Sequence, residues 1–128
     1  MTRLAARYMG ENEVDDNKSI MQMTPSEFDA LADAAFERLV RALEESSADC
    51  DWELKSAGVL ELEFAEGSRI VVNRHAAAQE IWVASKSGGH HFRWNGSTWT
   101  DTRDGSELFA ALSALLSRQS GSQVILGG

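Results

Sequence analysis

The chain has 128 residues, about the size of one domain. Apolar residues make up 43% and charged residues 25%, an ordinary globular composition that excludes wholesale disorder. No apolar run is long enough to span a membrane, so we expect no membrane partner. The net charge of −8 at pH 7 repels phosphate backbones, so we expect no nucleic-acid partner either.

Residues 1–22 differ in character from the rest of the chain. They contain several methionines that could serve as starts, and residues 10–19 are polar. They have no continuous apolar core, which a secretory signal requires. We therefore expect a flexible N-terminal extension over 1–22, either a tag or an upstream start, followed by one domain over 23–128. Without a secretion signal we expect a cytoplasmic protein whose single cysteine, Cys50, stays reduced.

The first predicted helix begins at a clear start signal. Thr24 can cap the helix, Pro25 suits the first helical position, and Glu27 completes a capping box. An apolar face then follows at helical spacing, formed by Phe28, Leu31, Ala32, Ala35, Phe36, Leu39 and Leu43. A polar stripe on the same helix contains Asp29, Asp33, Glu37 and Glu44, with Arg41 placed to pair with Glu37.

Nearly all of the excess negative charge lies in residues 24–53, which hold nine acidic and two basic residues. A solvated helix face is one interpretation, but the acidic run continues beyond the predicted helix into the next element. Carboxylate oxygens suit hard cations such as Mg²⁺, Ca²⁺, Mn²⁺ and iron, so we predict several weak, exchangeable cation sites. The alternative is that this band attracts a basic protein surface. The two interpretations are compatible.

After Ser47 the apolar period changes from 3.6 to 2, which predicts strands. In the first strand, Asp49, Asp51 and Glu53 face one side, while Cys50, Trp52 and Leu54 face the other. Further strands are predicted over 60–64, 69–74, 80–86, 90–95 and 98–101. The short turns between them allow only antiparallel neighbours. The longer, Ala-rich link over 75–79 predicts a loop.

A second helix closes the domain. Asp104 can cap it, with Glu107 three residues later, and Gly121 suits its end. Its apolar face comprises Leu108, Phe109, Leu112, Leu115 and Leu116, and we expect the apolar tail, residues 124–126, to lie against the domain. The fold class is therefore α+β, a two-layer sandwich with both one-sided helices on one face of a sheet of about six antiparallel strands.

The other face of such a sheet must meet solvent. If Ile81 and Val83 face the core, Trp82 points outward, and the same alternation exposes Asn73, His91 and Arg93. A solvent-facing tryptophan among such residues is typical of a protein-binding patch. If the strand phase were shifted by one residue, Trp82 would instead belong to the core.

No motif for a nucleophile, a phosphate loop, a dinucleotide or a zinc protease is present. The acids around Cys50 disfavour its thiolate, so we expect a small core residue rather than a nucleophile. His90 and His91 point to opposite faces of a regular strand and cannot chelate one ion. His75 is expected alone in a loop.

Several segments in order give the chain a family resemblance. These are Ser26-Glu27-Phe28 with Leu31-Ala32; Gly58-Val59-Leu60 with Leu62 and Phe64; residues 67–74; residues 79–89; Phe92 and Trp99; and Asp104-Gly105. With them the sequence resembles the frataxins, and is most similar to their bacterial CyaY type. The stretch from Asn73 to Gly89 is the most specific. A departure is the loop after Asn73, which lacks the proline that many relatives have.

The resemblance implies two helices on one face of an antiparallel sheet and a role in iron–sulfur cluster assembly. It implies weak, exchangeable binding of Fe²⁺ and Fe³⁺ by an acidic ridge, here Asp29, Asp33, Glu37, Glu44, Glu45, Asp49, Asp51 and Glu53. It further implies docking on a cysteine desulfurase and a cluster scaffold protein through Asn73, Trp82, His91 and Arg93. We expect a monomer that metal could drive into oligomers.

Three functions remain open at this stage. The first is a non-enzymatic, iron-binding regulator of cluster assembly. The second is a pure interaction module in which iron binding is incidental. The third is an iron-storage or ferroxidase protein. A ferroxidase needs two metals held by fixed ligands, and exposed carboxylates are poorly suited to that task. We therefore expect no enzyme activity.

Overall fold

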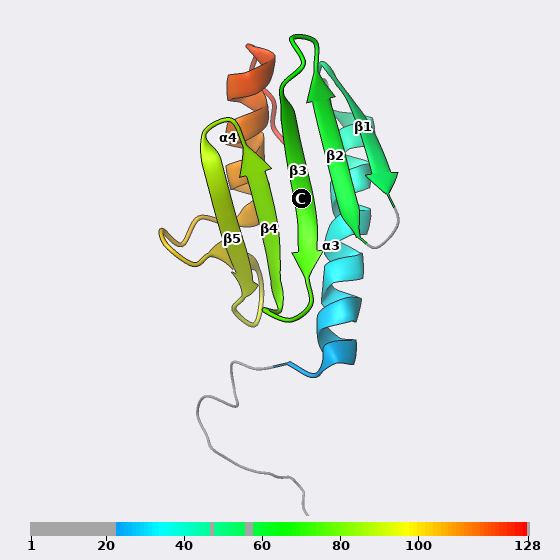
Figure 1. Ribbon diagram of the computed structural model, residues 1–128, viewed down its shortest axis with the longest axis vertical. Coiled ribbons are helices and arrows are strands. Elements are labelled where there is room, and N and C mark those ends of the chain that lie inside the picture. Colours follow the sequence, from blue (N-terminus) through cyan, green and yellow to red (C-terminus); the bar gives the residue numbers. More distant parts are fainter. Residues whose placement is uncertain (1–22, 47, 56–57, 128) are drawn as a thin grey trace, which may run out of the picture.

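The computed structural model describes residues 23–46, 48–55 and 58–127, so the predicted extension over 1–22 lies outside the described residues. The elements follow the order α3 (Pro25–Glu45), β1 (Cys50–Lys55), β2 (Val59–Phe64), β3 (Arg69–His75), β4 (Glu80–Ser85), β5 (Gly88–Trp94), β6 (Trp99–Asp101) and α4 (Leu108–Ser120). The six strands form one sheet in chain order, each antiparallel to its neighbour (Figure 1). The predicted fold class is confirmed.

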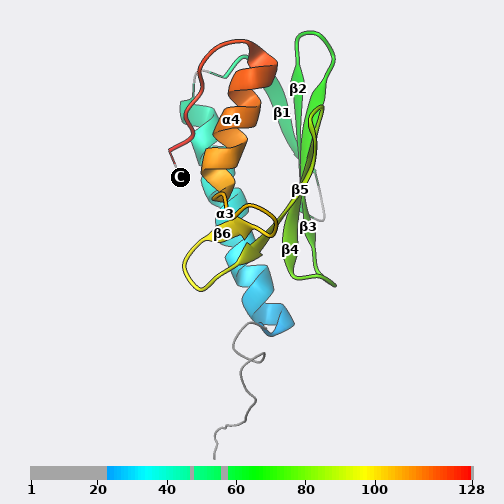
Figure 2. The same ribbon diagram turned by 90° about the vertical axis from the view of Figure 1, so that its left-hand side faces the viewer.

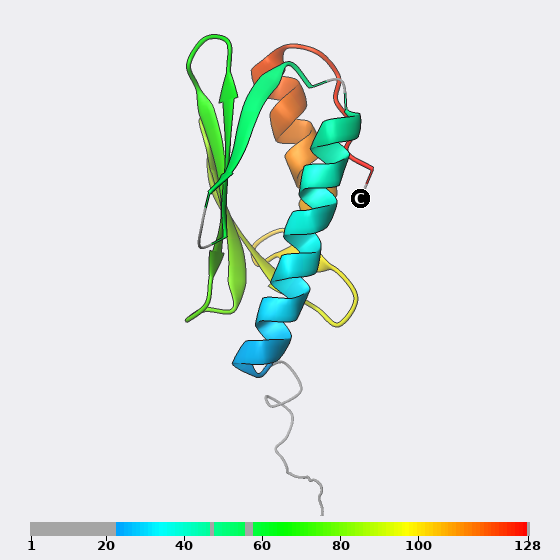
Figure 3. The ribbon, with the colours of Figure 1, turned by 90° about the vertical axis from the view of Figure 1, so that its right-hand side faces the viewer.

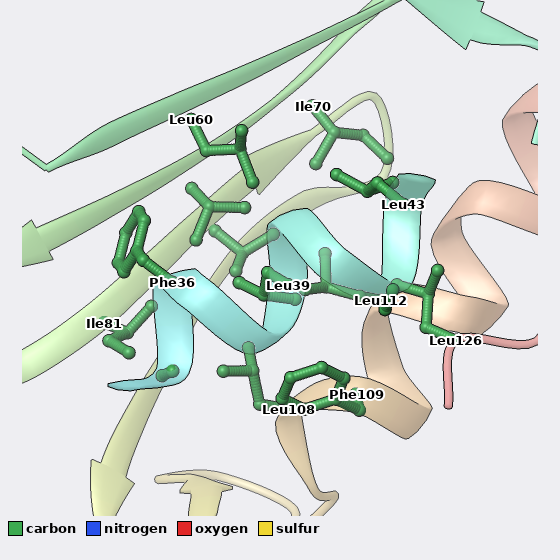
Figure 4. Close-up of a cluster of buried hydrophobic side chains, with 14 of the residues drawn as sticks. Phe36, Leu39, Leu43, Leu60, Ile70, Ile81, Leu108, Phe109, Leu112 and Leu126 are labelled. Carbon is green, nitrogen blue, oxygen red and sulfur yellow. The ribbon is translucent and has the colours of Figure 1, made fainter. Parts of the chain in front are cut away.

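The molecule has two layers. Both helices cover the same face of the sheet, and no described element covers the opposite face (Figures 2 and 3). The core fills the space between the layers, with side chains such as Leu39 and Leu112 from the helices and Ile70 and Ile81 from the strands (Figure 4). We call the sheet face that is turned away from the helices the outer face.

Helix α3 begins as its sequence predicts. The side chain of Thr24 accepts a hydrogen bond from the backbone N–H of Glu27, and the side chain of Glu27 accepts one from the backbone N–H of Thr24. The buried face of the helix comprises Phe28, Ala32, Ala35, Phe36, Leu39, Ala42 and Leu43. Because this face is apolar, the acids of α3 lie on the opposite, solvent side.

Helix α4 is capped by a different residue from the one predicted. Glu107, not Asp104, is the N-cap, and its carboxylate accepts from the backbone N–H groups of Phe109 and Ala110. Asp104 instead accepts from the backbone and side chain of Ser106, which folds the preceding loop. The helix ends at Gly121 in the left-handed region, as predicted.

Two further expectations, on His75 and on the C-terminal tail, need correction, and Leu54 is more exposed than its position on the helix-facing side of β1 suggests. His75 is not alone in a loop but is the last residue of β3. Leu54 is 51% exposed, because β1 is the edge strand and α3 does not cover its end. In the C-terminal tail, Val124 and Leu126 are buried, but Ile125 alternates outward and is 73% exposed.

Over the parts of the chain that the structure covers, neither helix combines the length and the apolar character needed to cross a bilayer.

Candidate functional site

The eight acids of the predicted acidic ridge come together along one edge of the molecule. Five lie on α3, Asp49 directly precedes β1, and the other two lie on β1, the edge strand of the sheet. All eight are exposed. Among the described residues, no three His, Cys, Asp or Glu side chains converge into a group that could hold a metal ion. The ridge therefore has the chemistry of diffuse electrostatic attraction rather than that of a chelate.

An arginine from the sheet reaches this ridge. Arg74 of β3 points toward the helix layer, where its Nη2 lies 2.6 Å from Oδ1 of Asp33 and its Nη1 lies 3.8 Å from Oδ1 of Asp29. Its guanidinium also lies over the ring of Phe36. Two of the predicted iron ligands thus carry a built-in counter-ion, which makes them poorer cation ligands than their exposure suggests.

The path of the Arg74 side chain depends on Gly58, the glycine that precedes β2. Gly58 adopts a φ of +74°, and a Cβ at this position would collide with the Arg74 side chain. The backbone N–H of Arg74 also donates to the carbonyl of Gly58. Gly58 therefore provides both the turn into β2 and the space in which the arginine crosses to α3.

Strand register extends the acidic surface beyond the predicted ridge. Asp51 is directly opposite Glu63, and Glu53 is directly opposite Glu61, on the outer face of β1 and β2. We call these four residues the acidic sheet patch. Lys55 forms an ion pair with Glu61 at 3.0 Å. The alternation of β2 puts Glu61 and Glu63 on the outer face, but only the register shows that they face Asp51 and Glu53.

A groove of about 550 Å³ runs between α3 and the end of β1, with Gly58 and Arg74 completing its lining. Its apolar side chains are Phe36, Val40 and Leu54, and its rim carries Asp33, Glu37, Glu44, Arg41, Lys55 and Arg74. The exposed Leu54 belongs to this groove. The mixed charge of the rim distinguishes the groove from the acidic sheet patch, whose four defining residues are all acids.

Cys50 lies at the start of β1 beside the acids. Burial raises the pKa of its thiol, and the neighbouring charges of Asp51 and Asp49 raise it further. The thiol is therefore protonated at neutral pH, which agrees with the expectation that Cys50 is not a nucleophile.

The outer face carries the second candidate region. Ile81 and Val83 are fully buried while Trp82 between them is half-buried, so the strand phase that places Trp82 outward is correct. In the register of the sheet, Asn73 and His91 lie on either side of Trp82. Arg93 lies opposite Glu80 in the next row of the same face. The four residues predicted for partner binding are therefore neighbours.

The indole of Trp82 is stacked between two imidazoles. The His75 ring lies 3.9 Å from it with planes at 14°, and the His91 ring lies 4.3 Å away on the other side with planes at 9°, measured between ring centroids. We call these three residues the outer-face stack. His75 was not among the predicted partner residues, because the sequence placed it in a loop instead of at the end of β3.

A buried carboxylate lies beside the outer-face stack. Glu80 is 6% exposed although it belongs to the outer face. Its Oε1 accepts the indole N–H of Trp82 at 2.8 Å, and its Oε2 accepts from Nη2 of Arg93 at 2.6 Å. Glu80 thus fixes the edge of the indole and one end of Arg93. No sequence pattern predicts this role, because an outward-facing glutamate is ordinarily solvated.

The third histidine faces the helix layer. Nδ1 of His90 lies 3.2 Å from Oδ2 of the buried Asp101, so the two adjacent histidines do point to opposite sides of β5. Burial disfavours the charged form of Asp101, but hydrogen bonds from the Arg103 backbone, His90 and the Asp104 backbone outweigh it and lower its pKa. His90 and Asp101 together hold the loop that leads to α4.

Comparison with known proteins places these features in a family. A family model described as a frataxin-like domain matches residues 21–122. A protein named iron-sulfur cluster assembly protein CyaY from Dechloromonas aromatica is 55% identical over 104 residues, covering 81% of this chain and 99% of its own length. A protein of the same name from Cupriavidus metallidurans is 52% identical over 102 residues, covering 77% of this chain and 92% of its own length.

Solved structures agree with these relatives. Frataxin from Psychromonas ingrahamii, described as a member of the CyaY protein family, is 34% identical, with a TM-score of 0.76 over 83% of this chain and all of that chain. A trimeric frataxin from the yeast Saccharomyces cerevisiae, complexed with ferrous iron according to its description, shares the fold at 23% identity and a TM-score of 0.57, over 84% of this chain and all of that chain. The chain therefore belongs to the frataxin family.

Proposed function

We propose that this chain is an iron-binding accessory protein of iron–sulfur cluster assembly, which docks on a cysteine desulfurase and regulates its delivery of sulfur. The observation that carries the proposal is the 55% identity, over almost the whole length of the relative, to a protein named for iron–sulfur cluster assembly. The proposed partners are the desulfurase and a cluster scaffold protein. The proposed setting is the bacterial cytoplasm. The proposed acting form is a monomer, and the proposed role is not enzymatic.

Two surfaces support this proposal in different ways. The acidic ridge and the acidic sheet patch offer exposed oxygen ligands without a rigid chelate, which suits weak and exchangeable Fe²⁺ or Fe³⁺. The same charges would steer a basic partner surface and make its binding sensitive to salt. The outer face adds Trp82 as an aromatic anchor with Asn73, His91 and Arg93 around it.

Iron storage and ferroxidase activity are less well supported. A ferroxidase centre needs fixed ligands that hold two metals close together. Over the residues that the structure describes, no group of three suitable side chains converges. A pure interaction module, in which iron binding is incidental, remains the second candidate, because Arg74 already pairs with Asp33 and lies near Asp29 in the ridge.

Binding to the cognate cysteine desulfurase, first without iron, tests the proposal. We would compare wild type with Trp82→Arg, with Asp51→Asn/Glu53→Gln, and with Glu66→Gln/Asp104→Asn, which removes the same amount of charge away from the ridge. We expect wild type and the control to bind, and the other two variants to bind at least tenfold more weakly. Equal binding by all four would refute the docking surfaces.

Anaerobic Fe²⁺ titration of the same four proteins separates the two candidates. If iron binding is part of the function, Asp51→Asn/Glu53→Gln weakens Fe²⁺ binding and removes any effect of Fe²⁺ on the desulfurase. If the protein is a pure interaction module, Fe²⁺ leaves the affinity of wild type for the desulfurase unchanged.

A further inference from the structure

The outer-face stack covers both faces of the Trp82 indole. His75 comes from β3 and His91 from β5, so the indole of β4 is held by residues of both neighbouring strands. A partner that docks here can meet only the edge of the indole and the exposed side of His91, whose side chain is 49% exposed. The two imidazoles therefore determine which part of the Trp82 indole a partner can contact.

The hydrogen bond made by His75 requires a neutral imidazole. The backbone N–H of Ala78 donates to Nδ1 of His75 at 3.2 Å, so this nitrogen carries a lone pair and no proton. Protonation would turn the acceptor into a second donor, and the bond would be lost. This bond closes the turn between β3 and β4, in which Gln79 adopts a φ of 55°.

His91 faces the carboxylate that positions the indole. Its Nδ1 lies 3.6 Å from Oε1 of Glu80, the same oxygen that accepts the N–H of Trp82. Arg93 occupies the other oxygen. A protonated His91 would donate to the same oxygen that accepts the indole N–H, and would so weaken the hydrogen bond between Glu80 and Trp82.

The charges around the outer-face stack are few. Among the residues that the structure describes, the titratable and charged groups that face it are His75 of β3, Glu80 of β4, and His91 and Arg93 of β5, while both helices lie behind the sheet (Figure 2). With neutral imidazoles, Arg93 balances Glu80. Histidine is the side chain whose charge most readily changes between about pH 5 and 8, so mild acid would place three cations around one carboxylate.

We propose that the outer-face stack holds Trp82 in a proton-dependent way: neutral His75 and His91 fix the indole for docking, and their protonation releases it. This inference rests on the proposed function, since it concerns the regulation of the same docking surface. An imidazolium attracts an indole face, so the rings can stay stacked in acid. Acid removes the hydrogen bond from Ala78 to His75 and weakens the one from the indole to Glu80, the two bonds that position Trp82 within the sheet.

The first test uses the free protein and needs no partner. The indole N–H of Trp82 and the backbone amide of Ala78 would be followed by ¹⁵N NMR between pH 8 and 5. In wild type we expect both signals to shift together with the His75 and His91 ring signals. The variant His75→Asn/His91→Phe keeps an acceptor for Ala78 and a ring on Trp82 but cannot titrate, and we expect it to show neither shift.

His90→Gln is the matched control, because His90 is next to His91 but faces the helix layer. We expect this variant to keep the wild-type titration of Trp82. A Trp82 signal that does not titrate in wild type, or that titrates equally in His75→Asn/His91→Phe, would overturn the inference.

The second test measures docking of the full chain on the cognate cysteine desulfurase at pH 7.5 and 5.5. Each variant is compared with itself, which cancels the pH response of the desulfurase. We expect the affinity of wild type to fall at least threefold more than that of His75→Asn/His91→Phe. Equal falls would overturn proton-dependent docking. If wild type binds at neither pH, the proposed docking function fails, and the NMR titration alone decides whether the stack is proton-sensitive.

Discussion

The guanidinium of Arg74 lies 2.6 Å from the carboxylate of Asp33, so a residue of the sheet neutralises an acid of the acidic ridge. The Arg74 side chain is only 18% exposed, whereas the Asp33 side chain is 67% exposed, so water screens the ion pair from the carboxylate side. The pair also links β3 to α3 and so contributes to the attachment of the first helix. The part of the acidic ridge around Asp33 therefore contributes to the stability of the fold.

We predict that Arg74→Gln lowers the free energy of unfolding by about 1–2 kcal/mol, because the ion pair and the contact with Phe36 are lost together. The same change frees Asp29 and Asp33 and should strengthen Fe²⁺ binding. Urea unfolding and anaerobic titration calorimetry measure the two effects. Arg118→Gln removes the same charge from α4 and should change neither; a weaker Fe²⁺ affinity in Arg74→Gln would contradict the assigned role.

We predict that Glu53→Gln raises the free energy of unfolding by roughly 0.2–1 kcal/mol, because Glu53 directly opposes Glu61 in the sheet. Urea unfolding at low salt should show the gain, and 0.5 M salt should reduce it by screening. Glu44→Gln is the control, since Glu44 belongs to the acidic ridge but has no cross-strand acid. An equal rise in the free energy of unfolding in both variants would mean that the total negative charge, and not the pairing of Glu53 with Glu61, destabilises the wild type.

Asp101 should make stability fall in acid. Its pKa in the folded protein lies below the ordinary value of 3.8, whereas the unfolded chain takes up the proton near that value. Because the unfolded state binds the proton first, this contribution is complete above about pH 4. It is lost as the pH falls through the folded pKa.

We predict that Asp101→Asn costs about 1–3 kcal/mol at pH 7, since buried hydrogen bonds are weakened, and that it flattens the decline of stability below pH 4. Urea unfolding at several pH values between 7 and 3 measures both. Part of the decline in the free energy of unfolding below pH 4 should persist in this variant. The pKa values of Glu66 and Asp104 are also lowered, by hydrogen bonds from Ser68 and Ser106, respectively. An unchanged slope would contradict the prediction.

We predict that Cys50 reacts with iodoacetamide more slowly than glutathione does at pH 8, because its raised pKa leaves little thiolate. Burial is the largest cause, so Asp49→Asn/Asp51→Asn should restore only part of the rate. The rate of alkylation as a function of pH is the measurement. Full restoration would show that charge, not burial, protects the thiol.

Most of the fold could be predicted because it follows from local patterns. The capping box at Thr24, the apolar face of α3 and the alternation around Trp82 each involve neighbouring residues, and the structure agrees with each. The cap of α4 was misplaced because Asp104 and Glu107 both suit a helix start. Their distinction depends on how the loop after β6 folds back onto His90.

The finer features of the candidate sites depend on pairings between distant segments. The opposition of Glu53 and Glu61 needs the register of two strands, and the reach of Arg74 to Asp33 needs the helix to lie across β3. A period of two shows which side a residue faces but not which residue lies beside it. For the same reason the partners of His75 were missed.

The position of β1 has a consequence for self-association. It is the long free edge of the sheet, and an exposed edge of this kind can pair with a second copy. Two copies that met along β1 would bring Asp51 and Glu53 of one against the same acids of the other. Their repulsion would oppose such pairing, so the carboxylates that would attract iron would also disfavour aggregation along β1, and any cation that neutralises them would weaken this effect.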